Sequence, residues 1–144
     1  ALPICLREEE VRSILEVRIA LDTLAATLCA ERITDEEIAS LGEIVERLGA
    51  AQTIDQAVRA AYDFQHEFAL LSGNTLIPLI FCSFKVAVTS LWERFCILYG
   101  IPALYENTYN LWTFLKNRDL NGAVSWIDKS VRESIDGNRK IYYE

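Results

Sequence analysis

Apolar residues recur at intervals of three and four positions along almost the whole chain, and this periodicity constrains the fold more than any other feature. Such spacing places apolar side chains on one face of an α-helix, whereas a half-buried strand would need strict alternation. We therefore predict an all-α protein, an antiparallel bundle of about six helices joined by short loops. The expected helices span residues 8–31, 34–47, 53–71, 76–99, 101–116 and 120 to about 134.

Helix start and stop signals lie at the ends of these periodic segments. Thr34-Asp35-Glu36-Glu37 has the form of a capping box, in which a hydroxyl and a carboxylate satisfy free backbone N–H groups, and Thr53-Ile54-Asp55-Gln56 repeats the pattern. Ser72-Gly73-Asn74 ends the third helix, because glycine and asparagine tolerate the left-handed conformation found there. Gly100-Ile101-Pro102 stops the fourth helix and starts the fifth.

The fourth expected helix, 76–99, is apolar nearly all round. Such a helix lies at the centre of a bundle or against a second chain, so we expect a homodimer. Pro78 and Lys85 interrupt its apolar run, which argues against a membrane span.

Size and charge limit the function. A chain of 144 residues is about one domain, and its net charge of −7 without a basic cluster argues against nucleic-acid binding by this chain alone. No export signal is recognisable at the N-terminus, and no C-x-x-C spacing occurs. We expect a cytoplasmic protein in which all four cysteines are small buried apolar residues: Cys5, Cys29, Cys82 and Cys96.

The motifs of common enzyme classes are missing. The single histidine, His66, cannot form a histidine cluster for a metal, and no glycine-rich nucleotide motif or G-x-S-x-G is present. His66 lies off the apolar stripe, beside Asp63 and Glu67, so we expect a partly exposed side chain. The sequence predicts neither catalysis nor a cofactor, although an enzyme that uses buried polar groups remains an alternative.

Several polar side chains occupy positions that the periodicity places toward the core: Arg18, Gln65, Lys85, Thr108 and Ser130. Each has a structural alternative. Arg18 can pair with Asp22 one turn later, and Lys85 can extend to solvent from the end of its stem. Thr108 and Ser130 can bond to carbonyls of their own helices. Together they predict a ligand cavity with a few inward polar groups.

Two cations in that cavity would favour an anionic ligand, such as a carboxylate, a fatty acid or an acyl-CoA. We expect its acidic group at Arg18 or Lys85 and its remainder against Phe81, Trp112 and Trp126. The alternative is a purely structural dimerisation domain with a filled core and no ligand.

Three segments resemble a known family. Arg18-x-x-x-Asp22 with the later Thr34 cap is similar to the opening of the FCD domain, and Phe64-Gln65 followed by Ser72-Gly73-Asn74 is similar to its F-H…S-G-N signature. Lys116-Asn117-Arg118-Asp119 looks like the turn between its last two helices. The chain therefore resembles the FadR/FCD subfamily of GntR-superfamily transcription regulators. The resemblance implies that residues 1–144 form one effector-binding and dimerisation domain, and that the N-terminal winged-helix domain, which would bind DNA, is absent from this chain.

Many FCD domains bind a divalent metal through one aspartate and three histidines. The resemblance places those four positions at Ala61, Gln65, Thr108 and Ser130, which do not supply the charge or imidazole nitrogens that such a metal needs. We expect no metal, as in the FadR branch, where the ligand is a long-chain acyl-CoA.

Overall fold

The computed structural model describes residues 6–142 and is helical throughout its regular structure, which confirms the predicted all-α class. Within this part of the chain there are seven helices rather than six, because the fourth expected helix is divided in two. The helices are α1 (Glu8–Arg32), α2 (Asp35–Gly49), α3 (Ile54–Leu71), α4 (Leu76–Ser83), α5 (Lys85–Tyr99), α6 (Ile101–Lys116) and α7 (Leu120–Ile135).

The predicted capping box at Thr34 is confirmed. Glu37 N–H donates to Thr34 Oγ1 at 3.1 Å, and Thr34 N–H donates to Glu37 Oε1 at 2.9 Å. Only half of the second box forms, because the Gln56 side chain accepts from Gln52 N–H while Thr53 Oγ1 accepts from Gln56 N–H. Both hydroxyls still satisfy an N–H group at the start of a helix.

The break between α4 and α5 falls at Phe84, and the two helices are bent by 66°. Phe84 N–H donates to Phe81 O, which closes a tighter turn than an α-helix, and Ser83 Oγ donates to Ile80 O at 2.6 Å. A serine bonded back to its own helix is a known cause of bending. The bend allows α4 and α5 both to pack on α3, in different directions.

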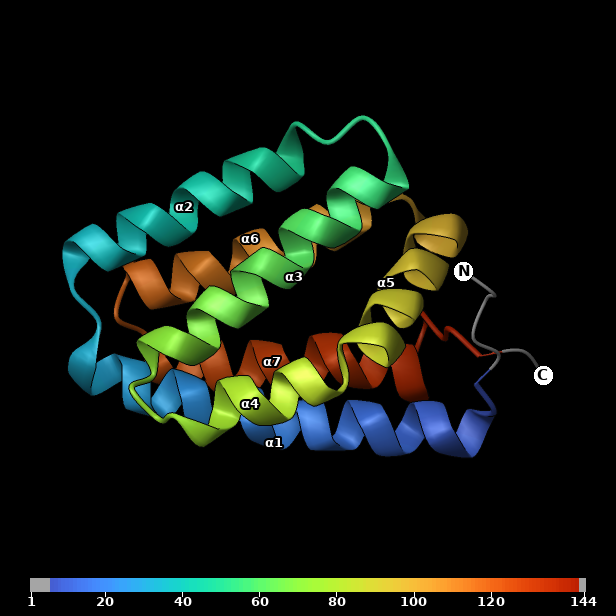
Figure 1. Ribbon diagram of the computed structural model, residues 1–144, viewed down its shortest axis with the longest axis horizontal. Coiled ribbons are helices and arrows are strands. Elements are labelled where there is room, and N and C mark those ends of the chain that lie inside the picture. The colour runs from blue at the N-terminus through green and yellow to red at the C-terminus, as the bar shows by residue number, and fades with distance from the viewer. Residues whose placement is uncertain (1–5, 143–144) are drawn as a thin grey trace.

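The helices form a bundle in which α1 and α7 lie side by side, and α2 packs against both α3 and α6 (Figure 1). The α6 and α7 helices also contact one another, as do α3 and α5. As a result, α1, α3, α6 and α7 surround a common interior, and α5 adjoins it through its contacts with α3 and α6.

Two apolar clusters make up the core, and they meet near the middle of the bundle. The first contains Leu15, Trp92 and Val131, and the second contains Ala25, Phe68 and Ile127. Along α1, Leu15 belongs to the first cluster and Ala25 to the second. Along α7, Ile127 belongs to the second cluster and Val131 to the first. Four of the five polar positions predicted to line a cavity lie at this boundary: Arg18, Gln65, Thr108 and Ser130.

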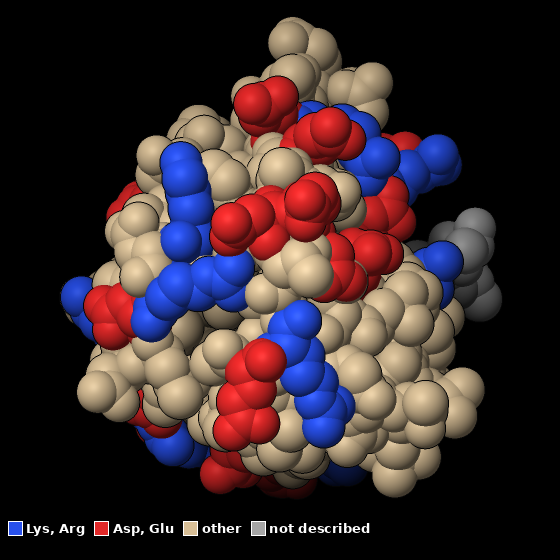
Figure 2. All heavy atoms as spheres, turned by 90° about the vertical axis from the view of Figure 1, so that its left-hand side faces the viewer, with Lys and Arg blue, Asp and Glu red and all other residues tan. Residues whose placement is uncertain are grey.

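No single helix in residues 6–142 is both long enough and apolar enough to cross a membrane. The α4 and α5 helices would reach that length and apolar character only together, across their 66° bend. On the end of the bundle shown in Figure 2, several acidic side chains gather across the middle with basic side chains beside them, and no continuous basic surface forms there.

Candidate functional site

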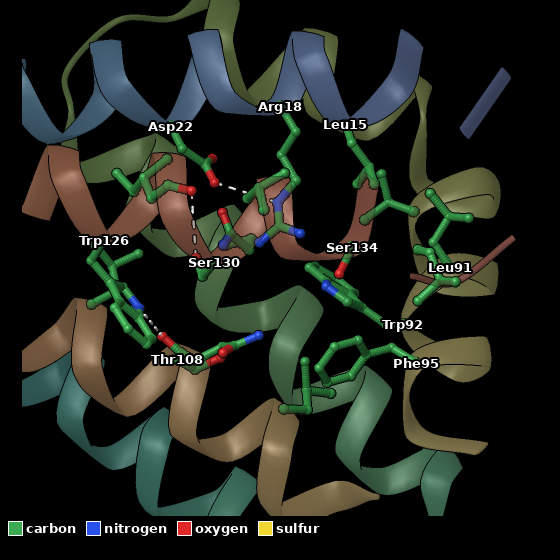
Figure 3. A pocket seen from close by; sticks show the side chains of 18 residues that line it. Leu15, Arg18, Asp22, Leu91, Trp92, Phe95, Thr108, Trp126, Ser130 and Ser134 are labelled. Atoms are coloured by element: carbon green, nitrogen blue, oxygen red, sulfur yellow. Dashed lines mark hydrogen bonds and ion pairs between the residues drawn. The ribbon is translucent and has the colours of Figure 1, made fainter. Parts of the chain in front are cut away.

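A cavity of about 40 Å³ lies at the boundary between the two apolar clusters. Its walls come from α1, α3, α5, α6 and α7, and from Ile141 after the last helix. In Figure 3, Arg18 and Asp22 extend from α1 toward Ser130 and Ser134 of α7, with Thr108 across the cavity. Arg18 and Asp22 are the only charged side chains among the described residues that line it.

Arg18 and Asp22 form an ion pair one helical turn apart. Arg18 Nε lies 3.4 Å from Asp22 Oδ2, and the two side chains are 20% and 8% exposed. In the amide orientation that satisfies both neighbours, Gln65 of α3 donates to Asp22 Oδ1 at 3.1 Å and accepts from Arg18 Nη2 at 3.2 Å. These three residues therefore form a closed polar triad inside the core, with zero net charge when Asp22 is ionised.

Two further features concern the contacts of Arg18 and the ionisation of Asp22. The Arg18 guanidinium carbon lies 5.3 Å from the centre of the Trp92 ring, a cation–π contact, while Arg18 Nε is buried without a hydrogen bond among the described residues. Burial raises the pKa of Asp22 to about 6, against the opposing effects of Arg18 and Gln65. Asp22 is consequently the one carboxyl in the cavity wall that changes charge near neutral pH.

Hydroxyl groups and one indole complete the polar surface. Ser130 Oγ donates to Ile127 O at 3.4 Å, the bond to its own helix that was the structural alternative for this residue. The described residues provide no such bond for Thr108. Trp126 Nε1 donates to Asn107 O at 2.9 Å and ties α7 to α6 at the cavity wall. The Thr108 hydroxyl can therefore donate to or accept from an occupant, and the Ser130 hydroxyl can still accept.

Of the seven candidate ligand-binding residues, five line this cavity: Arg18, Gln65, Thr108, Ser130 and Trp126. Their role in binding remains a prediction. Lys85 and Trp112 lie elsewhere. Ala61, the fourth position implied for a family metal, is buried in the first apolar cluster rather than in the cavity wall.

Lys85 does not face the core, contrary to the sequence-based expectation. It is exposed at the start of α5, and its Nζ lies 4.7 Å from the centre of the Tyr62 ring. The cause is the break at Phe84, which changes the direction of the helix and ends the register extrapolated from Leu76. Trp112 faces α2, where Nε1 donates to Ile38 O at 2.9 Å.

Three cavity residues were not singled out as ligand contacts from the sequence. Asp22 was considered only as a partner of Arg18, and Trp92 and Asn107 were not considered. Asp22 carries a usable signal, since a helix that turns Arg18 inward also turns the residue four positions later inward. For Trp92 no such signal exists, because its orientation depends on the break before α5.

Among the described residues, no cysteine or histidine lines the cavity. Cys29 and Cys96 are buried as expected, and burial raises the pKa of their thiols to about 12 and about 11. Cys82 is exposed, which corrects the expectation that it is buried, and Cys5 lies outside the described residues. His66 is partly exposed and stacks on Tyr62. Within residues 6–142 no cluster of histidine, cysteine, aspartate and glutamate could hold a metal.

A second hollow lies on the outside of α1. This groove of about 200 Å³ runs between α1 and the α4–α5 bend and is lined by Val17, Leu21, Phe81, Phe84 and others. Arg18 lines both the groove and the internal cavity. The α1 helix is therefore a shared wall between an interior polar site and an apolar outer surface.

Comparison with known proteins gives two findings. The family model of the FCD domain matches residues 13–132. Among solved structures, the chain is similar to E. coli McbR/YncC, with a TM-score of 0.74 and 19% sequence identity over 88% of this chain. The match spans 66% of that longer chain, and at this identity it concerns the fold. No curated protein sequence matches significantly.

Proposed function

The chain belongs to the FCD domain family, and we propose that it is the effector-binding domain of a GntR-type transcription regulator, with the internal cavity as the effector site. In this proposal a small metabolite enters the bundle and changes how a separate DNA-binding domain engages DNA in the cytoplasm. The observation that carries the proposal is the closed triad of Arg18, Asp22 and Gln65 in the wall of a cavity within the core.

The cost of burying the Arg18–Asp22 ion pair supports a binding site rather than a purely structural role for the triad. Charged groups are costly to bury, and a well-packed apolar layer of similar volume is often at least as stable as a buried ion pair. Here the ion pair borders a cavity instead of a filled core, and hydroxyls of Thr108 and Ser130 border the same space. An apolar cavity with a few convergent polar groups is the usual form of a small-molecule site.

The size of the cavity narrows the class of ligand. A volume of about 40 Å³ holds about three water-sized groups. A carboxylate of about five or six heavy atoms would therefore require the lining side chains to shift, whereas a fatty acid or acyl-CoA would require the helices themselves to separate. We propose a small carboxylate, bound through Arg18, because Arg18 is the one cation among the described residues of the wall.

Self-association is the second part of the proposal. Large apolar side chains are exposed on and around the α4–α5 bend, with Leu79 66%, Val86 63% and Leu76 59% exposed, and Val17 of α1 adds to the same side at 45%. Groups of large exposed apolar side chains are typical of protein interfaces. We propose that a second copy of the chain covers this surface, as a regulator with two DNA-binding domains requires.

The shared wall offers a route for regulation. Because Arg18 contacts both the cavity and the outer groove, a ligand that draws Arg18 inward would also change the surface that the second copy covers. A coupling of only about 1–3 kcal/mol changes DNA affinity by about 5–150-fold. A small displacement of α1 is sufficient for an effect of that size.

Binding of small carboxylates tests the proposal. We expect native mass spectrometry of the purified chain to show a bound small molecule, and calorimetry to detect saturable binding from a panel of short carboxylic and amino acids. Arg18→Met, which keeps the apolar stem, should abolish binding while the chain stays folded. Arg59→Met is the matched control, since Arg59 lies on the surface of α3 in an ion pair with Asp55.

The opposite result would favour the structural alternative. If no ligand co-purifies, no panel member binds, and Arg18→Met lowers the melting temperature as its only effect, then the triad is a structural element of a dimerisation domain. Sedimentation of the same preparations would then still report whether the chain pairs.

A further inference from the structure

We propose that the effector is a small zwitterion, in which a carboxylate and an ammonium group lie on neighbouring atoms, as in a short α-amino acid. This inference rests on the proposed function and specifies its ligand. The geometry that carries it is the presence of one cation and one anion in direct contact at the cavity wall, Arg18 and Asp22, with Gln65 bridging them.

Charge balance is the first reason. Arg18 and Asp22 are the only charged side chains among the described residues that line the cavity, so its wall is neutral overall when both are ionised. A carboxylate alone would leave one uncompensated negative charge in the interior, and an amine alone would leave one positive charge; both arrangements are unfavourable in a medium of low polarity. A zwitterion adds a charge of each sign and keeps the interior neutral.

The triad also presents the two complementary recognition surfaces that a zwitterion needs. Arg18 Nε faces Asp22 Oδ2 at 3.4 Å without forming a hydrogen bond, so a ligand carboxylate that displaces Asp22 can accept from it. Asp22 can accept from an ammonium group, which the Thr108 and Ser130 hydroxyls of the same wall can also bind.

Gln65 suits both the empty and the occupied state. Its amide now accepts from Arg18 and donates to Asp22, so it bridges groups of opposite charge. When a ligand separates Arg18 from Asp22, the same amide can turn its oxygen toward the ammonium group and its nitrogen toward the carboxylate. A residue with only donors or only acceptors could not serve both states.

A monocarboxylate has one competing way to bind, which is to bring a proton to Asp22. The groups that interact with Asp22 are Arg18 on α1 and Gln65 on α3. The other described residues of the cavity wall, from α5, α6 and α7, are uncharged, so Arg18 is the only charged group near Asp22 there. With the pKa of Asp22 at about 6, such binding would weaken by about tenfold for each pH unit above that value. A zwitterion requires no proton, so its affinity stays constant in the same range.

Three probes with a shared carbon skeleton separate these cases. L-alanine carries both charges, propionate is alanine without its ammonium group, and ethylamine is alanine without its carboxylate. At about pH 8 we expect calorimetry to show L-alanine binding at least about tenfold more tightly than either of the other two. Between about pH 7 and pH 8 its affinity should not change.

Asp22→Asn provides the reciprocal test. Removal of the anion makes the cavity wall positive, so this variant should prefer propionate over L-alanine, a reversal of selectivity that loss of folding cannot imitate. Asp55→Asn, at an exposed ion pair on α3, is the control and should keep the wild-type preference. If the Asp22 variant does not fold, the pH series on the wild-type chain decides alone.

The possible failures are distinguishable. If propionate binds the wild-type chain as tightly as L-alanine at about pH 8, the zwitterion proposal is wrong and the effector-binding function stands. If none of the three probes binds, and no molecule co-purifies, both proposals are wrong and the triad is structural.

Discussion

Stability should fall as the pH rises through the pKa of Asp22. Burial raises that pKa from its ordinary 3.8 to about 6, since the folded chain favours the neutral carboxyl. The sign follows directly, because between these two values the folded state binds more protons than the unfolded state. The stabilising effect is fully present below the unfolded pKa and is lost as the pH rises through the folded pKa.

The shift of about 2 pH units corresponds to about 3 kcal/mol, at about 1.4 kcal/mol per unit. Asp22→Asn isolates this effect, because it removes the titrating group and leaves a side chain of the same shape. Urea unfolding of both proteins from about pH 4 to pH 7 gives the free energy of unfolding at each pH. We expect the wild type to lose about 2 kcal/mol relative to the variant across this range, since the unfolded carboxyl is already partly ionised at about pH 4.

Nuclear magnetic resonance provides a direct check, since the carboxyl carbon of Asp22 should titrate near pH 6. A stability difference that stays constant with pH would refute the reasoning. A difference that moves in favour of the wild type as the pH rises would show that the ion pair with Arg18 outweighs the cost of burial, so that the pKa lies below its ordinary value.

Three further predictions concern stability, each measured by chemical denaturation. Gly42→Ala should destabilise the fold by about 1–3 kcal/mol, because the new Cβ would lie 2.8 Å from Cζ2 of the Trp112 ring; unchanged stability would mean that the ring can move aside. Trp126→Phe should cost about 1 kcal/mol through loss of the bond to Asn107 O, and no loss would indicate that the bond is replaced by water. Thr34→Ala should lower the free energy of unfolding by about 1 kcal/mol, because it removes the N-terminal cap of α2. An unchanged value would mean that this cap does not stabilise the fold.

Local signals were sufficient to predict most of the fold. The caps at Thr34 and Thr53 and the stop at Ser72-Gly73-Asn74 lie where the structure begins or ends helices, because these residues act through bonds to their own backbone neighbours. Such bonds depend on only a few adjacent residues. They can therefore be recognised without knowledge of the tertiary structure.

The break at Phe84 could not be predicted in the same way. Neither proline nor glycine occurs at residues 82–86, so the sequence contains no helix breaker there. The local bonds at the bend, Ser83 Oγ to Ile80 O and Phe84 N–H to Phe81 O, could form in many helices, and only the packing of α4 and α5 on α3 distinguishes this position. As a consequence, the periodicity alone predicts an inward Lys85, whereas the structure shows this residue exposed.

The candidate site was predictable where a single helix determines direction. Four of the predicted residues lie on regular stretches of four different helices: Arg18, Gln65, Thr108 and Ser130. The apolar periodicity of each helix predicts that these side chains point inward, and all four line the same cavity. Pairing within the site was harder to predict. The bridge that Gln65 forms between Arg18 and Asp22 depends on the relative height of α1 and α3, which no spacing along the chain determines.

The central claim is that a small molecule binds in the internal cavity, and the three tryptophans of the chain test it within one spectrum. Trp92 and Trp126 line the cavity, whereas Trp112 packs on α2 and serves as an internal control. During titration with L-alanine, we predict that the indole N–H resonances of Trp92 and Trp126 shift with the same saturation curve, while that of Trp112 stays unchanged. Saturable binding that shifts Trp112 alone, or none of the three, would contradict the assignment of this cavity as the effector site.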